Sequence, residues 1–466
     1  MSYTTIELPL VGPTSQNRAK QFSSAFTKNF YIEVTEGGDT ILHPFLGTKI
    51  FSDKVTIGAD RGSHVHKGQL YTVTGSILEL IKEDGTRTNL GNIAGLARCV
   101  FADDGQDMMI TAEGRVYKFD TALNEQTDVD FESPHTVAYL NSRFIYDGSL
   151  NRFGVSEVLD GGNIDTLNYG SADSAPDDIV RVYTFDQRLY LMCERTIEPH
   201  YNTDTGSPPY QRIDTGIMQK GLGAIYSVSN TDLFMYFLGD DRQVYQLKGS
   251  SIQHISTPAL DHEIQGFSKT SDAVGFCFTM QGQDWYFLTF TSANVTFLYS
   301  ETNNVWVKLS FGVSNDRHIA GSYQFVYGKH LVTGHADGTV YEWDINTFTD
   351  DSQVIQRQRI LPVISGERIK APGKRLQMSR VELLMERGTG NTDQSDPVVM
   401  VEVSMDGGRS WETMKHLDVG QAGEFLTKIE YYHIESFYEA TVRITTSDPN
   451  FFSIRAASID IRTAGY

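Results

Sequence analysis

Residues 70–81 read LYTVTGSILELI, in which two apolar stretches flank a turn at Gly75, the pattern of a β-hairpin. The unit recurs at residues 108–119, 144–155, 189–201, 234–247, 285–299 and 330–343. Its seven turns are centred on Gly75, Gly114, Gly148, Arg195, Asp240, Ser292 and Gly338. Successive turns lie about 44 residues apart, and a repeat of about 40–50 residues with several strands per unit is typical of a β-propeller.

A four-stranded blade also requires a strand before each hairpin. Stretches that mix small and large apolar residues, as an inner strand at a crowded axis needs, occur at residues 97–101, 136–140, 180–185, 224–228, 274–278 and 321–326. We therefore predict an all-β fold with a β-propeller of six or seven blades over residues 51–350. The alternative is a series of generic hairpins in one or two β-sandwiches.

The two ends of the chain differ from the repeats. Residues 1–50 mix polar sequence with short apolar pieces and are predicted to form an N-terminal arm. Alternating apolar stretches at 398–403, 427–432, 440–445 and 453–461 predict a C-terminal antiparallel β-sandwich over residues 356–466. The 41 Gly, 23 Tyr and 26 Phe residues favour short strands and tight turns, so no long helix is expected.

The chain has 466 residues with 39 basic and 59 acidic side chains, which gives a net charge of −20. This balance argues against a protein that clamps nucleic acid over a large basic surface. Most of the negative charge lies before residue 356, whereas residues 357–387 hold eight basic residues and only three acidic ones.

Three widely separated cysteines, Cys99, Cys193 and Cys277, make neither a disulfide framework nor a zinc-binding spacing, which fits assembly in a reducing compartment. The first residues lack the basic start and long apolar core of a signal peptide. No apolar run approaches the roughly 18 residues of a membrane span, so no such span is expected.

Residues 404–411, SMDGGRSW, match the Asp-box pattern of sialidase-type propellers through Ser404, Asp406, Gly408 and Trp411. In such a turn the Asp carboxylate accepts backbone N–H groups, Gly permits positive φ and Trp packs beneath the loop. A glycosidase would carry several such boxes inside its propeller, and it would need paired carboxylates or a Tyr nucleophile with an Arg cluster. Because this single box lies outside the predicted propeller, we interpret it as a structural turn.

No sequence pattern points to a cofactor, a metal or a catalytic group. His64-Val65-His66 places two imidazoles on one face of a strand, but no third ligand follows nearby, so a surface strand or loop is predicted. The acidic run at residues 103–107 lacks the downstream Glu of a calcium loop and is predicted to be a turn between strands. Neither GxxxxGK[ST] nor GxSxG occurs, so we predict that the protein is not an enzyme.

The stretch from residue 188 to 223, RLYLMCERTIEPHYNTDTGSPPYQRIDTGIMQKGLG, resembles the packaged-DNA stabilisation proteins, also called tail hub or nozzle proteins, of short-tailed bacteriophages. In that family a strand ends in a Thr-Ile-Glu-like triplet, here Thr196, Ile197 and Glu198, and a Gln-Lys-Gly follows, here Gln219, Lys220 and Gly221. Residues 374–390, 396–411 and 443–461 are similar to the family's terminal sandwich. HPFLGTKIF at 43–51 is similar to a further family region, although Leu46 stands where Pro is usual.

The resemblance implies a structural virion protein located in the tail and assembled in the host cytoplasm. It implies a homo-hexameric hub that retains packaged DNA, with a tail adaptor protein above and spike, fibre or needle proteins below. Duplex DNA would pass the hub without tight binding, because each neutralised phosphate adds affinity through counterion release. A sialidase-like propeller glycosidase and a protein-binding propeller adaptor are the alternative functions.

Within the basic stretch, Arg368, Lys370, Lys374 and Arg375 are the candidate residues for pairing with an acidic face of a neighbouring subunit or of the adaptor. The alternative is that these four side chains are simply solvated cations, which contribute little to any contact.

Overall fold

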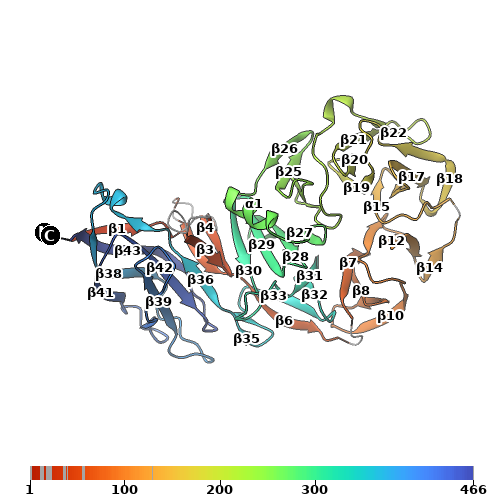
Figure 1. Ribbon diagram of the computed structural model, residues 1–466. Coiled ribbons are helices and arrows are strands. Elements are labelled where there is room, and N and C mark those ends of the chain that lie inside the picture. The colour runs from red at the N-terminus through yellow and green to blue at the C-terminus, as the bar shows by residue number, and fades with distance from the viewer. Residues whose placement is uncertain are drawn as a thin grey trace.

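The computed structural model describes residues 3–10, 15–16, 24–34, 38, 40–54, 58–128 and 130–464. Nearly all of its regular structure is β, and the described residues contain one α-helix, α1 (Pro258–Gln265). Figure 1 shows a ring of sheets on the right and a second unit of two sheets on the left, which carries the C-terminus. The prediction of an all-β fold without a long helix is confirmed.

The ring consists of seven four-stranded blades, so the predicted β-propeller is confirmed with seven blades. The first six blades pair their strands antiparallel, in chain order from the axis outward. The first three blades are β7 (Asp60–His66), β8 (Gln69–Thr74), β9 (Ile77–Ile81) and β10 (Arg87–Asn92); β11 (Val100–Asp103), β12 (Met108–Ala112), β13 (Arg115–Phe119) and β14 (Leu123–Gln126); and β15 (Val137–Leu140), β16 (Arg143–Asp147), β17 (Arg152–Glu157) and β18 (Asp160–Ser171).

The next three blades follow the same order around the ring in Figure 1. They are β19 (Ile179–Phe185), β20 (Arg188–Cys193), β21 (Ile197–Asn202) and β22 (Tyr210–Arg212); β23 (Ser229–Asn230), β24 (Met235–Leu238), β25 (Val244–Lys248) and β26 (Ser251–His254); and β27 (Ala273–Met280), β28 (Gln283–Phe290), β29 (Val295–Ser300) and β30 (Val305–Leu309). A 3-10 turn, η1 (Asp214–Gly216), follows β22.

The seventh blade closes the ring with a strand from the other end of the chain. Its first three strands are β31 (Ala320–Val326), β32 (Lys329–Gly334) and β33 (Val340–Asp344), and its outer strand is β6 (Gly47–Ser52). Trp343 of β33 pairs with Thr48 of β6. The short strand β34 (Thr349–Asp350) continues this sheet beyond β6 and pairs with β35 (Gln353–Val354).

The seven hairpins found in the sequence are the two middle strands of the seven blades, β8–β9 through β32–β33. Five of the six predicted inner strands overlap observed ones, β11, β15, β19, β27 and β31. The sixth, over residues 224–228, is wrong because Ser227 folds back and donates both its N–H and its hydroxyl to the Ala224 carbonyl. The inner strand of that blade, β23, therefore begins only at Ser229.

The middle strands are apolar on both faces because every blade lies between two others. β12 reads MMITA and β24 reads MYFL, and all of these residues are buried. Separate apolar clusters fill six of the seven junctions between neighbouring blades. The seventh junction, between the sixth and seventh blades, belongs to a larger core that includes the second unit. This arrangement explains the continuous apolar stretches in the sequence, since a strand covered on both faces need not alternate.

The second unit contains two sheets built from both ends of the chain. One sheet runs β4 (Phe30–Val34), β5 (Thr40–Pro44), β43 (Ile454–Thr463), β38 (Leu376–Met385) and β41 (Ile429–Phe437), and β1 (Thr4–Leu8) also pairs with β43. The other runs β3 (Ser24–Lys28), β36 (Arg357–Ile360), β42 (Glu439–Thr446), β39 (Val398–Ser404) and β40 (Lys415–Asp418), with β2 (Ser15–Gln16) beside β3 and β37 (Ile364–Ser365) beside β42. A short helix, η2 (Gly366–Ile369), follows β37.

One apolar core joins this unit to the propeller. It contains Val401 and Ile444 of the second unit together with Leu298 of the sixth blade and Val332 of the seventh. At the junction, buried Asn29 accepts a hydrogen bond from Ser310 N at 2.8 Å and donates to Gln356 O at 2.9 Å. The two units therefore pack as one body, with the strands β1 to β5 and β36 to β43 on the same side of the ring (Figure 1).

His318 makes the stability of this core dependent on pH. Its side chain is buried against Phe287 and Trp343, and burial lowers its pKa to about 3. An unfolded chain binds this proton near the ordinary value of about 6.5, so between about pH 6.5 and 3 the unfolded state holds more protons and stability falls as pH falls. The His318→Asn variant should remove this contribution, about 2 kcal/mol between pH 7 and pH 5, while its amide oxygen can still accept from Ala320 N.

Denaturant unfolding at pH 7 and pH 5 measures this difference. The control is His416→Asn, because His416 is exposed on β40 and the same change there should leave the pH dependence unaltered. An identical pH dependence in wild type and His318→Asn would show that His318 does not contribute.

Candidate functional site

The basic stretch at residues 357–387 divides into buried and exposed side chains. Arg357 and Arg359 lie on β36 with no measurable exposure, and burial lowers the pKa of each to about 10. Arg359 donates to the Thr27 hydroxyl at 2.7 Å, and Arg357 donates to the Phe348 carbonyl at 3.1 Å. These two arginines hold the junction between the sheets and cannot meet a partner protein.

Arg380 is also occupied within the fold. Its guanidinium donates to Asp460 at 2.9 Å and to Glu430 at 2.8 Å, which lie on the two strands that flank β38. The pairing raises the pKa of Arg380, mainly through the hydrogen bond to Asp460. Arg380 therefore links three strands across the face of one sheet.

The four predicted interface residues lie together on one loop. Arg368, Lys370, Lys374 and Arg375 are all exposed and fall between β37 and β38; we call residues 366–375 the basic loop. Arg375 donates one hydrogen bond, to the Ser436 carbonyl at 3.3 Å. Arg368, Lys370 and Lys374 form no ion pair with any residue that the structure describes, so their charges face solvent.

The Asp-box turn stands beside the basic loop. The Asp406 carboxylate accepts hydrogen bonds from Arg409 N at 2.8 Å and from Ser410 N at 2.9 Å, and Ser404 donates its hydroxyl to it at 2.7 Å. Desolvation raises the pKa of the Asp406 carboxyl, but the hydrogen bonds from Ser410 and Ser404 outweigh this effect and hold the pKa well below its usual range. Gly408 has φ +91°, and the Arg443 guanidinium lies 4.2 Å from the centre of the Trp411 ring.

A cavity of 370 Å³ joins the two features at this end of the molecule. Arg375 of the basic loop and Asp406 of the turn both line it, together with Tyr438, whose side chain is exposed. The tertiary structure thus brings one residue from each of two separately predicted sets, Arg375 and Asp406, onto one concave surface. Tyr438 was missed by the sequence analysis, because a single aromatic residue between strands carries no signal of exposure.

The family-motif residues lie in the fourth blade and in the segment that leads to the fifth. Thr196 donates its N–H to Asp177 at 2.9 Å, and Ile197 exchanges two backbone hydrogen bonds of 3.0 Å with Met218. Glu198 is fully buried and accepts from Ser174 N at 2.6 Å. These residues fasten the chain segments that enter and leave the fourth blade.

Of the second triplet, Gln219 is exposed, whereas Lys220 pairs with Asp241 at 2.5 Å. A Cβ on Gly221 would lie 1.9 Å from the Glu194 carbonyl oxygen, so only glycine allows this close approach of two backbones. The triplet is therefore built mainly for the passage of the chain from one blade to the next.

The propeller axis holds a cavity of 310 Å³ lined by residues of six blades. Polar side chains bridge this cavity. Arg98 donates a hydrogen bond to the Gly321 carbonyl at 3.0 Å, and Tyr226 donates one to the Arg98 carbonyl at 3.1 Å. Arg181 donates one to the Ile225 carbonyl at 2.6 Å. These hydrogen bonds connect blades across and around the axis. The polar groups that line the cavity thus serve ring closure.

The prediction of a surface strand or loop at His64-Val65-His66 is wrong. These residues belong to β7, the innermost strand of its blade, and His66 is buried. The His64 ring contacts the Asp103 carboxylate of the neighbouring blade. Residues 104–107 form the predicted turn, with Asp104 accepting from Gln106 N at 2.8 Å.

The cysteines and the membrane-span search give no further site. Cys99 and Cys193 are buried, Cys277 is partly buried, and all three are free thiols. No helix in the described ranges combines the length and the apolar character needed to cross a bilayer.

Comparison with known proteins gives one family. The family model described as "Bacteriophage P22 Gp10, beta-propeller", a phage stabilisation family, matches residues 6–348. No curated protein matches the sequence.

Similar solved structures include the WD40 β-propeller domain of Doa1 (TM-score 0.43, 11% identity, 64% of this chain and 98% of that chain covered). BamB from Moraxella catarrhalis has a TM-score of 0.40 at 11% identity, with coverage of 74% and 97%. The Neurospora crassa Pan2 WD40 domain has a TM-score of 0.42 at 9% identity, with coverage of 65% and 94%.

Proposed function

The chain belongs to the phage stabilisation family of the bacteriophage P22 Gp10 β-propeller, and on that premise we propose that it is the tail hub, or nozzle, of a short-tailed bacteriophage. In this role it forms part of the head-to-tail channel, retains packaged DNA and anchors the distal tail proteins. The observation that carries the proposal is the family match, which extends over the whole propeller.

The size of the cavity at the propeller axis decides whether DNA could pass through a single subunit. The axial cavity has a volume of only 310 Å³ and is bridged by the hydrogen bonds of Arg98 and Arg181. A duplex whose major groove alone is about 12 Å wide does not fit such a cavity. We therefore propose that DNA runs through the central channel of a homo-hexameric ring, and that each propeller forms part of the wall of that channel.

The net charge of −20 suits such a wall. A wall that neutralised many phosphates would bind DNA tightly through counterion release and slow its ejection, whereas an acidic wall lets it slide. The partners that need specific contacts are the neighbouring subunits, the adaptor above, and the spike, fibre or needle proteins below.

The basic loop is the surface that we assign to such a contact. Its four cations are exposed, and one of them, Arg375, lines the cavity together with Asp406. In an acidic protein, an unpaired basic loop is complementary to the acidic surfaces of its own neighbours. A catalytic role for the adjoining Asp406 is not proposed, because its carboxylate is occupied by the hydrogen bonds of the turn.

Charge reversal of the basic loop tests this function. Replacing Arg368, Lys370, Lys374 and Arg375 by Glu should lower the yield of infectious particles at least about a hundredfold, because like charges across a contact cost several kcal/mol. The particles should lack completed tails and leak DNA, while the isolated protein should melt within a few degrees of wild type.

The control reverses four exposed cations of the propeller and so makes the same change in net charge: Lys82, Arg195, Lys248 and Lys269. Particle counts, plaque assays and electron micrographs of the tails measure the outcome. Normal tails and normal infectivity in the basic-loop variant would refute the assignment of this loop as an interface. Mass determination of the protein with its neighbouring tail proteins tests the hexamer separately.

A further inference from the structure

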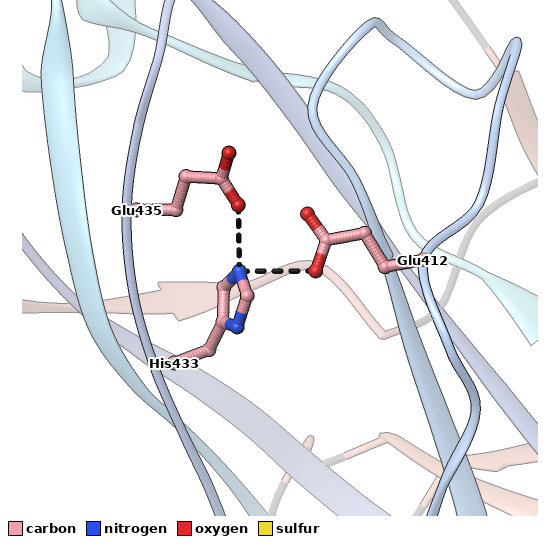
Figure 2. A group of neighbouring side chains, drawn as sticks. All are labelled: Glu412, His433 and Glu435. Carbon is pink, nitrogen blue, oxygen red and sulfur yellow. Dashed lines mark hydrogen bonds and ion pairs between the residues drawn. The ribbon is translucent and has the colours of Figure 1, made fainter.

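Three side chains near the free edge of the second unit converge on one point. Figure 2 shows Glu412, His433 and Glu435 with both carboxylates directed at the same imidazole nitrogen. His433 Nε2 lies 3.0 Å from a Glu412 oxygen and 3.0 Å from a Glu435 oxygen. Glu412 follows the Asp-box turn, whereas His433 and Glu435 lie on β41, the edge strand of the other sheet.

A proton alone satisfies this arrangement poorly. An imidazole nitrogen carries one hydrogen, which can be directed well at one acceptor. Neither Glu412 nor Glu435 pairs with a lysine or arginine that the structure describes, so even a charged His433 would leave one negative charge unbalanced.

The spacing of the three groups is close to that of donor atoms around one small cation. At tetrahedral angles, ligands about 2.0–2.2 Å from a zinc ion are separated from one another by about 3.3–3.6 Å. The two observed nitrogen–oxygen distances are 3.0 Å, so the side chains need to move apart by only a few tenths of an ångström to hold the ion. A divalent ion with a neutral imidazole would balance both carboxylates.

The surroundings hold the imidazole in place for this role. The Tyr431 hydroxyl lies 3.1 Å from His433 Nδ1, and the two rings stack with their centres 5.5 Å apart. A partner on the second ring nitrogen is the usual means of orienting a metal-binding histidine. On the other side, Glu412 N donates to the Val403 carbonyl at 3.0 Å, which positions the backbone that carries the third ligand.

We propose that Glu412, His433 and Glu435 bind a divalent transition-metal ion, Zn²⁺ or an ion of similar preference, and that the ion fastens the Asp-box segment to the edge strand β41. A nitrogen ligand with two carboxylates suits Zn²⁺ better than Ca²⁺ or Mg²⁺, which prefer oxygen ligands only. His433 is 22% exposed, so the remaining coordination positions face water. The proposal does not depend on the tail-hub function.

Calorimetric titration of the full-length, EDTA-treated and dialysed protein with zinc chloride tests the site. Wild type should bind one Zn²⁺ per chain, and a large excess of magnesium chloride should not displace it. His433→Asn and Glu412→Gln should each weaken binding at least about tenfold. His416→Asn, which removes an exposed histidine of the same unit, should bind as wild type does.

Thermal unfolding with and without zinc chloride provides a second measurement. Zinc should raise the melting temperature of wild type and of His416→Asn, and it should not raise that of His433→Asn. Circular dichroism in EDTA shows whether each variant is folded; Glu435→Gln, at a side chain 49% exposed, replaces any variant that is not. Absence of binding by wild type, or equal binding by wild type and the ligand variants, would overturn the proposal.

Discussion

Replacing Arg61 with methionine is expected to lower the free energy of unfolding by at least about 4 kcal/mol. Arg61 lies on β7 with 1% of its surface exposed, and it donates four hydrogen bonds to backbone carbonyls. They belong to Gly75, Ile93, Ala94 and Ala97, at 2.6–3.0 Å. Methionine would fill similar space but leave the buried Ile93 carbonyl and three partly buried carbonyls without this donor, and an unsatisfied buried group costs about 1–3 kcal/mol.

Denaturant unfolding at neutral pH measures the change. Arg115→Met is the control, because Arg115 is an exposed arginine whose partner Glu125 lies on the adjacent strand, and its loss should change stability little. Arg61→Lys should recover only part of the lost stability. The four carbonyls surround the planar guanidinium of Arg61, and a single ammonium group cannot donate to all of them. A stability of Arg61→Met close to wild type would mean that water or a backbone shift satisfies these carbonyls.

The Trp343→Ala variant is expected to lose about 4 kcal/mol of stability. Trp343 is 3% exposed, and its ring centre lies 5.6 Å from that of Phe45, 5.1 Å from that of Phe278 and 5.8 Å from that of Tyr323. These rings come from β31, from the sixth blade and from the residues just before β6. Truncation would therefore open a cavity where the closing strand meets two blades.

Two further tryptophan variants make this prediction specific. Trp411→Ala should cost only about 1 kcal/mol, because Trp411 is partly exposed and its ring is covered on one side by Arg443. Trp343→Phe should cost less than Trp343→Ala, since it retains a ring and the Trp343 Nε1 has no hydrogen-bond partner in the described residues to lose. Equal melting temperatures of the two alanine variants would contradict the central position that we assign to Trp343.

The basic stretch shows where sequence reasoning reached its limit. The sequence places eight cations in one segment, and nothing in their spacing separates Arg359, which is buried under another strand, from Arg368, which faces solvent. That difference arises because β36 lies between β3 and β42, strands that are remote from it in the chain. Burial of a charged side chain is decided by what packs above it, so composition alone does not reveal it.

The proposed metal site had a weak signal that could have been used. His433-Ile434-Glu435 places an imidazole and a carboxylate on the same face of a strand, as alternation with a period of two requires. The third ligand, Glu412, belongs to the other sheet and reaches this strand only through the packing of the two sheets. A search for pairs at this spacing would have named two of the three residues.

The sequence by itself determined the repeated hairpins and their turns, because strand alternation, apolar content and turn residues act over a few neighbouring positions. The number of blades, six or seven from the sequence, was settled at seven by the tertiary structure. Only the tertiary structure decided how the ring closes: Lys49 of β6 pairs with Asp344 of β33, 295 residues away. It also decided that β1, β3, β4 and β5 join strands from the C-terminal end. Such pairings depend on which strand edges remain open once the blades have packed, and no local pattern records that outcome.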